Sequence, residues 1–140
     1  MTDELAQRTD QLSGVWNIVP TPFHPDETLD LESLRTLTDF VIESGVDGMT
    51  ILGVLGEGGK LSDAERSAVI DITLSHAGGR VPVCVTVSAA SGFRAAEYAR
   101  EARTAGAHSV MLSAPPLARP NDDAVRRHYL RVAEAVPELP

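Results

Sequence analysis

Short apolar runs rich in β-branched residues alternate with longer amphipathic stretches, and this order recurs about every 30 residues. The apolar runs predict strands over residues 14–20, 48–52, 81–87 and 109–113. The amphipathic stretches predict helices over residues 31–44, 62–77, 92–104 and 121–136. Strands and helices that alternate in this way are typical of a parallel sheet built from βα units.

Residues with known capping chemistry mark the ends of these helices. Ser62-Asp63-Ala64-Glu65 forms a capping box, in which a hydroxyl and a carboxylate serve the free amides reciprocally. Asp30 and Asn121 are expected N-caps, while Gly45 and Gly106 are expected to end their helices. The helix boundaries are therefore predicted independently of the hydrophobic pattern.

The last residues, 139–140, resemble the start of a further strand. A sheet that stops there would leave an unpaired parallel edge, so we expect something to continue it. Four βα units are half of an eightfold barrel, which needs about 250 residues. The alternative is a small doubly wound sheet of the flavodoxin type.

Composition narrows the classes of function. The net charge is -8, from 12 basic and 20 acidic residues spread along the chain, which argues against nucleic acid and anionic membranes as partners. The single cysteine, Cys84, lies in an apolar run, so we expect a buried thiol and a reducing, cytoplasmic location. Residues 1–8 carry acids without an apolar segment, and no run of about 18 apolar residues occurs, so neither secretion nor a membrane span is expected.

Three stretches follow predicted strands and carry a recognisable combination of residues. They are Val19-Pro20-Thr21-Pro22-Phe23, Gly53-Val54-Leu55-Gly56-Glu57 and Pro115-Pro116-Leu117-Ala118-Arg119-Pro120. Together with Leu61-Ser62-x-x-Glu65-Arg66, they resemble the dihydrodipicolinate synthase and N-acetylneuraminate lyase family. The match in order and spacing runs from about residue 14 to residue 140.

This resemblance implies the N-terminal half of a (β/α)8 barrel over residues 14–140, preceded by a tail over residues 1–13. It also implies a lyase or aldolase acting on 2-keto acids and aldehydes, homo-oligomeric when complete, as in the tetramers of the family, and without a cofactor. The family's chemistry uses a strand-six lysine that forms a Schiff base and a strand-five tyrosine that moves protons. Both positions lie beyond Pro140, so the chain holds no catalytic residue and is expected to be inactive alone.

The resemblance implies that Gly53, Val54, Leu55 and Gly56 bind the keto acid, because successive backbone amides form an anion-binding concavity. Other loop positions are expected on the same face: Thr21, Pro22, Glu57, Pro116 and Leu117. Val54 and Leu55 replace two hydroxyl residues of the family, and Leu117 replaces a tyrosine. Aliphatic groups pass no protons, which argues against genuine dihydrodipicolinate synthase activity. The apolar mouth that these residues form would suit a larger or aromatic aldehyde.

Charged and polar residues near this face have plainer interpretations. Lys60 is expected to be solvated, and Glu57 is expected to accept amide hydrogen bonds within its loop. Thr86 and Ser88 place hydroxyls either at the barrel mouth or in the cap of the next turn.

Elsewhere, no cofactor or metal site is predicted. The glycines after residue 52 do not follow the dinucleotide-binding spacing. His24 and Asp26 lie close together, but the histidines show no metal-ligand spacing.

Trp16 and Tyr98 are expected to be packing residues. Arg126, Arg127 and Arg131 predict a solvated helix face, with a role in an interface left open.

A different class of function also fits the sequence. Two half-barrels could assemble into one barrel and bind small carboxylates without catalysing a reaction.

Overall fold

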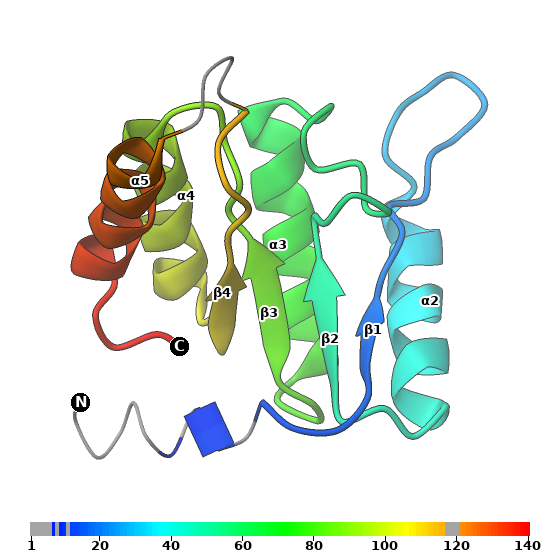
Figure 1. Ribbon diagram of the computed structural model, residues 1–140. Helices are drawn as coiled ribbons and strands as arrows, with labels where there is room; N and C mark the ends of the chain where they lie inside the picture. The colour runs from blue at the N-terminus through cyan, green and yellow to red at the C-terminus, as the bar shows by residue number, and fades with distance from the viewer. Residues whose placement is uncertain (1–6, 8, 11, 117–120) are drawn as a thin grey trace.

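The computed structural model describes residues 7, 9, 10, 12–116 and 121–140 and consists of one sheet with helices packed on it (Figure 1). The strands are β1 (Trp16–Ile18), β2 (Gly48–Ile51), β3 (Val83–Thr86) and β4 (Ser109–Met111). The helices are α2 (Leu31–Glu43), α3 (Asp63–Ala77), α4 (Gly92–Ala105) and α5 (Asp122–Ala135). All strand pairs are parallel, and their spatial order β1-β2-β3-β4 is the sequence order.

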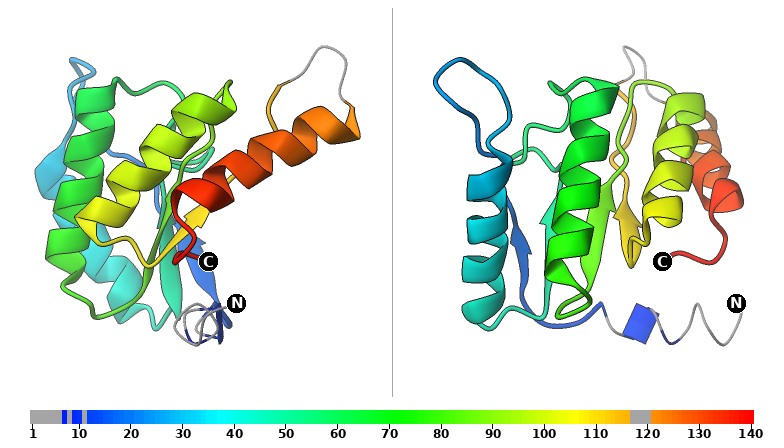
Figure 2. Two further views of the ribbon diagram at one scale, coloured as in Figure 1. Left: turned by 90° about the vertical axis from the view of Figure 1, so that its left-hand side faces the viewer. Right: turned by 180° about the vertical axis from the view of Figure 1, so that it is seen from behind.

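This arrangement is the first half of a (β/α)8 barrel. Seen from behind, α2, α3 and α4 lie over one face of the sheet, and α4 is followed by α5 at the β4 edge (Figure 2). A doubly wound sheet would reverse its strand order and carry helices on both faces. The flavodoxin-type alternative is therefore wrong.

The predicted elements are all present, with strands shorter than their apolar runs. The run over residues 14–20, for example, contributes only Trp16–Ile18, because ladder pairing ends where the chain turns into the next loop. The helix caps are confirmed. The side chains of Asp30 and Asn121 each accept a hydrogen bond from the backbone amide three residues further along the chain. Ser62 and Glu65 form the expected capping box.

The core lies between the sheet and the helices. Successive strand residues point to opposite faces. On the covered face, Met49, Ile51 and Val85 are no more than 1% exposed, and the small side chains of α4 let that helix approach closely. Together they form a continuous apolar core.

The other face of the sheet carries smaller and more polar side chains. Thr50 pairs with Cys84, which pairs with Ser109, across three strands. Cys84 is a buried free thiol, as expected, and burial raises its pKa. The described helices do not cover this face (Figures 1 and 2).

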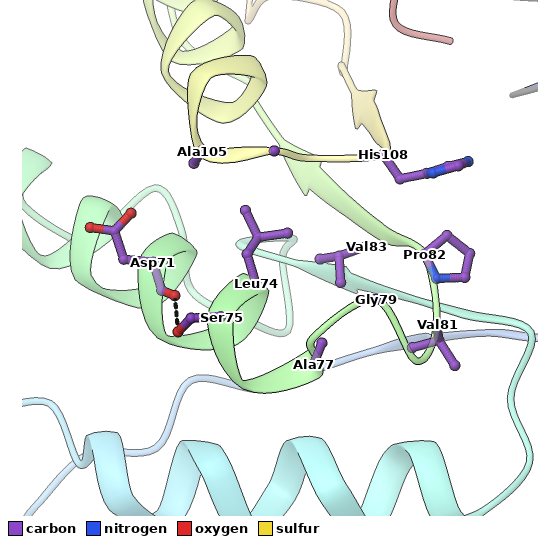
Figure 3. Close-up of a pocket in the computed structure, with 11 residues that line it drawn as sticks. Asp71, Leu74, Ser75, Ala77, Gly79, Val81, Pro82, Val83, Ala105 and His108 are labelled. Carbon is purple, nitrogen blue, oxygen red and sulfur yellow. Dashed lines mark hydrogen bonds between the residues drawn. The ribbon is translucent and has the colours of Figure 1, made fainter. Parts of the chain in front are cut away.

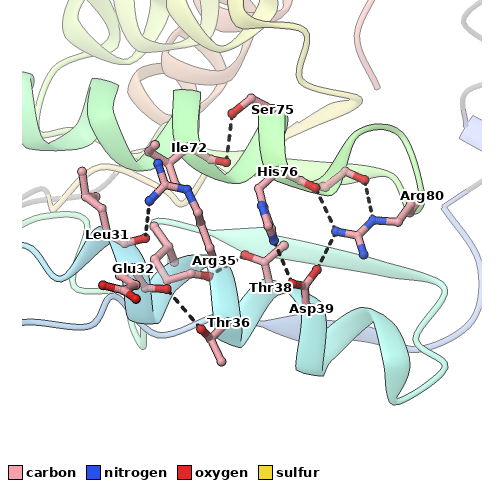
Figure 4. A network of polar contacts seen from close by, with 12 residues as sticks. Leu31, Glu32, Arg35, Thr36, Thr38, Asp39, Ile72, Ser75, His76 and Arg80 are labelled. Atoms are coloured by element: carbon pink, nitrogen blue, oxygen red, sulfur yellow. Dashed lines mark hydrogen bonds and ion pairs between the residues drawn. The ribbon is translucent and has the colours of Figure 1, made fainter.

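A polar network joins α2 to α3 on the outer surface (Figure 4). The carboxylate of Asp39 lies 2.9 Å from Nε2 of His76 and accepts a 2.7 Å hydrogen bond from Arg80. These two partners hold the pKa of Asp39 below its usual value.

The end of the chain meets the β4 edge. The amide of Val110 donates a 3.0 Å hydrogen bond to the carbonyl of Pro140. The expected further strand is not formed within residues 139–140, but this bond has the position of a first ladder contact. Among the described helices, none combines the length and apolarity needed to cross a membrane.

A cavity of about 610 Å³ opens between the C-terminal ends of α3 and α4 (Figure 3). It is lined by the start of β3, by Asp71 of α3 and by His108 before β4. Ser75 donates its hydroxyl hydrogen to the backbone carbonyl of Asp71. This cavity lies at the N-terminal ends of the strands, whereas function in barrel folds collects at the C-terminal ends.

Candidate active-site face

The C-terminal ends of parallel strands meet at one edge of the sheet, so the loops that follow them lie together (Figure 1). The loop after β2, residues 52–61, holds the predicted binding residues. It lies between the loop after β1 and the end of β3. Its shape depends on two features of its backbone, the close approach of its glycines and two left-handed residues.

The glycines of this loop are needed for space rather than for left-handed backbone. A Cβ at Gly58 would lie 2.2 Å from the carbonyl oxygen of Leu52, and one at Gly56 would lie 3.0 Å from that of Val19. The left-handed positions are instead non-glycine residues, Leu52 with φ 60° and Glu57 with φ 53°. Such conformations are costly and cluster at functional sites.

Thr21 fixes this loop from the side of β1. Its Oγ1 donates a 2.6 Å hydrogen bond to the carbonyl of Gly56, and the side chain is buried. Pro22 has a different role, because its carbonyl accepts from the amide of Asp30 and closes the loop before α2. Thr21 therefore supports the loop after β2, and Pro22 does not line the cavity described below.

Arg66 supports the same loop from below. It is 2% exposed and donates 3.0 Å hydrogen bonds from Nη1 to Gly58 and from Nη2 to Thr86. One buried guanidinium thus ties the loop after β2 to the end of β3. Burial lowers the pKa of Arg66 from its usual value.

Tyr98 of α4 has more than the packing role expected for it. Its ring lies 4.0 Å from the guanidinium carbon of Arg66 and 4.7 Å from that of Arg94, as measured to the ring centroid. Its hydroxyl donates a 3.0 Å hydrogen bond to Asp63, which also pairs with Arg94. Hydrogen bonds from Arg94 and Tyr98 hold the pKa of Asp63 below its usual value.

Sequence reasoning used Arg66 only as part of a motif and gave it no role. The only signal available was its place next to Glu65 in the segment after the glycine loop. Its partners are backbone carbonyls, and because every residue has one, the types of residue in the sequence do not indicate which carbonyls Arg66 contacts.

A cavity of about 330 Å³ opens above these supports, lined in part by Gly53, Val54, Thr86, Ser88 and Ser113. Thr86 and Ser88 therefore lie at the mouth, one of the two positions expected for them. Ser88 also accepts a 2.8 Å hydrogen bond from the amide of Ser113, which ties the segment after β3 to the loop after β4. The Oγ1 atom of Thr86 is buried and has no hydrogen-bond partner among the described residues.

The loop also presents free backbone donors. No described residue accepts a hydrogen bond from the amides of Val54, Leu55 or Gly56. Val54 is 99% exposed and lines the open cavity, whereas Leu55, which is 59% exposed, does not line it. Chemically, the arrangement offers amide donors and a hydroxyl for an anionic group beside an apolar mouth.

Glu57 and Lys60 pair with each other. Nζ of Lys60 lies 2.6 Å from Glu57 Oε2, and the lysine side chain is 77% exposed. The expectation of a solvated lysine is confirmed. The expectation that Glu57 accepts amides within its loop is wrong, because the half-exposed carboxylate turns outward to the ammonium group.

The remaining predicted residues are not brought into this cavity. The predicted binding residues Leu55 and Gly56 do not line it, nor does the exposed Pro116, and Leu117 lies outside the described residues. Asp26 accepts from Thr28, and within the described residues no group of three potential metal ligands occurs.

Comparison with known proteins identifies related chains. A model of the dihydrodipicolinate synthetase family matches residues 11–140. A 4-hydroxy-tetrahydrodipicolinate synthase of Sorangium cellulosum is 41% identical over 127 residues, which are 90% of this chain and 42% of that protein. A second such synthase, from Nitrosococcus oceani, is also 41% identical and is matched over 40% of its length.

Solved structures agree with the sequence comparison. A dihydrodipicolinate synthase crystal structure superposes with a TM-score of 0.87 at 31% identity, over 92% of this chain and 44% of that one. YagE, an E. coli K12 prophage protein of the same family solved in complex with pyruvate, gives a TM-score of 0.87 at 30% identity and is covered over 43% of its chain. The chain thus spans less than half the length of the relatives it matches.

Proposed function

The chain belongs to the dihydrodipicolinate synthetase family, and on that premise we propose that it forms the carboxylate-binding half of a lyase acting on 2-keto acids. The nucleophilic lysine and the proton-transferring tyrosine would come from a second half of the barrel. Lys60, the only lysine of this chain, lines the same cavity, but its ammonium group pairs with Glu57 and its side chain is 77% exposed, which does not favour imine formation. The chain by itself would bind substrate without turning it over.

The observation that carries this proposal is the set of free donors in the loop after β2 and in the cavity beside it, which Val54 and Thr86 line. The amides of Val54, Leu55 and Gly56 have no acceptor among the described residues, and Thr86 Oγ1 lies buried nearby without a partner. Buried polar groups without partners are costly unless a ligand satisfies them. A keto acid carboxylate would accept these hydrogen bonds, in keeping with the pyruvate complex of the relative YagE.

The apolar rim bears on the second substrate. With Val54 and Leu55 in place of hydroxyl residues, the loop offers no group to relay protons to a polar aldehyde. We therefore propose that the complete enzyme accepts a larger or aromatic aldehyde rather than acting as a genuine dihydrodipicolinate synthase. A panel of keto-acid adducts would test this, and cleavage of polar sugar acids alone would contradict it.

Pyruvate titration of the 140-residue chain, followed by amide NMR, tests the carboxylate site. We expect saturable shifts at residues 53–56 and weaker binding by the Thr86→Val variant, with Thr36→Val on the exposed surface of α2 as the matched control. Borohydride treatment with pyruvate should leave the mass of this chain unchanged. If pyruvate shifts amide signals elsewhere and not at residues 53–56, the proposed site is contradicted. A reduced adduct on Lys60 would contradict the proposal that the nucleophilic lysine belongs to the second half of the barrel.

A second candidate function is a half-barrel that assembles with another half and binds small carboxylates. It is favoured by the face of the sheet that the described helices leave uncovered. Intact mass of the protein from its own source separates the two. A mass near twice 14.9 kDa supports the front half of a lyase, whereas 14.9 kDa with a stable dimer supports the assembly module. For the complete enzyme we propose a cytoplasmic homo-oligomer.

A further inference from the structure

A second concave site lies outside the face described above, where α4 begins against α5. The two helices pack side by side at the β4 edge of the sheet (Figure 2). A cavity of about 240 Å³ opens there, lined by Ala90 and Gly92 at the start of α4 and by Arg127, His128 and Arg131 of α5. None of these residues lines the cavity of the glycine loop.

The charges around this cavity are positive. Within the described residues, neither Arg127 nor Arg131 is in an ion pair. The first turn of α4 carries no acidic residue, whereas those of α2, α3 and α5 each do. The positive end of the α4 dipole is therefore left uncompensated beside two guanidinium groups.

A buried histidine, His128, lines the cavity. His128 is 5% exposed, and no described residue forms a hydrogen bond with either of its ring nitrogens. A Cβ built on Gly92 would lie 3.4 Å from Nδ1 of His128 and 3.5 Å from Cδ of Arg131. Both side chains thus face the start of α4, and the absence of a side chain at residue 92 keeps the space between them open.

We propose that this cavity binds a phosphate group. Guanidinium groups match the geometry of a phosphate with paired N–H donors, and the start of a helix adds free amides of the same polarity. The unpartnered His128 supplies a further donor at the floor. The net charge of the chain is -8, so its overall field repels anions. A local cluster of cations is therefore needed to bind one, and it would bind an anion at this place in particular. The inference does not rest on the proposed lyase function.

Calorimetric titration of the 140-residue chain with inorganic phosphate at constant ionic strength tests the proposal. Arg127→Gln and Arg131→Gln should each weaken binding about tenfold, the scale of one charge-assisted hydrogen bond. Arg126→Gln is the matched control, because Arg126 is exposed on the same helix and does not line the cavity. An equal loss in all variants, or no saturable binding by the unmodified chain, would overturn the proposal.

Gly92→Ala provides an independent variant that leaves every charge in place. Its methyl group would narrow the cavity, so weaker phosphate binding is expected, and unchanged affinity would contradict a site at the start of α4. Methyl phosphate distinguishes the sources of the ligand: tighter binding than phosphate supports a phosphorylated small molecule, and weaker binding supports free phosphate. Acetate that binds as well as phosphate would overturn the assignment of ligand class.

Discussion

Two isoleucines on opposite faces of the sheet have different surroundings. Ile51 of β2 is 1% exposed in the core beneath the helices, whereas Ile18 of β1 is 43% exposed on the uncovered face. The covered face is built from large aliphatic side chains that this chain buries by itself. The uncovered face carries Thr50, Cys84 and Ser109, which are small enough to lie inside a closed barrel.

The difference shows which face of the sheet is packed by residues of this chain alone. We expect the helix-covered core to supply most of the stability of this chain, and it also supports the loop after β2 through Arg66 of α3. On the uncovered face the large side chain of Ile18 stays half in water, so we expect it to contribute less to stability than the core residues do. Substitutions that are matched in chemistry but differ in position can test this contrast.

The largest effect is expected from one substitution made on each face. Ile51→Ala should lower the free energy of unfolding by about 2–5 kcal/mol, because it removes buried methyl groups and leaves a cavity. Ile18→Ala should cost less than about 1 kcal/mol, since its side chain is already half in water. Urea denaturation measures both. Equal losses would mean that the uncovered face is packed in solution, for instance by a second copy.

The next largest effect concerns the link from the covered face to the site. Arg66→Met should lower the free energy of unfolding by about 2 kcal/mol, because the carbonyls of Gly58 and Thr86 lose their donor. Amide exchange should accelerate in the loop after β2. Arg35→Met, on the exposed surface of α2, serves as the control. If the loop exchanges at its original rate in the Arg66 variant, Arg66 does not hold it.

Thr21 should have a smaller effect, because it contributes one neutral hydrogen bond. Thr21→Val keeps the shape of the side chain and leaves the carbonyl of Gly56 without its donor, for an expected loss of about 1 kcal/mol. Thr36→Val removes a similar hydroxyl from an exposed helix position and should change stability by less than about 0.5 kcal/mol. Thermal unfolding compares the two variants, and indistinguishable midpoints would argue against a supporting role for Thr21.

The smallest effect is expected on the outer surface of the covered face, at Asp39. Its pKa in the folded state lies below the usual 3.8, chiefly through the hydrogen bonds with His76 and Arg80. A carboxyl whose folded pKa is lowered contributes stability above its unfolded pKa, and this contribution disappears as the pH falls through the folded value. Below about pH 4, the unmodified chain should therefore lose stability more steeply than Asp39→Asn. If stability falls equally steeply in the two proteins below about pH 4, the interactions of Asp39 with His76 and Arg80 do not contribute to stability.

Much of the fold could be predicted from the sequence. The alternation of apolar runs and amphipathic stretches predicted each strand and helix, and Asp30, Ser62, Glu65 and Asn121 marked the helix starts correctly. These features are local, because a cap depends on residues within one turn. Strand ends were less predictable, since pairing with a neighbour decides where a strand stops.

The candidate site was predicted in part. The glycine loop was found from its motif, yet Glu57 was assigned amide partners and instead pairs with Lys60. The roles of Arg66 and Tyr98 were missed. Thr86, which accepts from Arg66, and Asp63, which accepts from Tyr98, belong to other βα units than their donors, and the partners of Arg66 are backbone carbonyls, so the local sequence does not indicate these contacts.

The sequence by itself determined the order of the elements, the ends of the helices and the resemblance that led to the family, because periodicity, capping and loop motifs act over a few residues. Only the tertiary structure decided that Thr21 and Arg66 support one loop, that Thr86 lies unpartnered at its cavity and that Gly92 faces Arg131. Apart from the bond between Arg66 and Gly58, these contacts join residues from different βα units. The physical reason is that a parallel sheet brings the ends of successive units to one edge, where hydrogen bonds form between groups far apart in the chain.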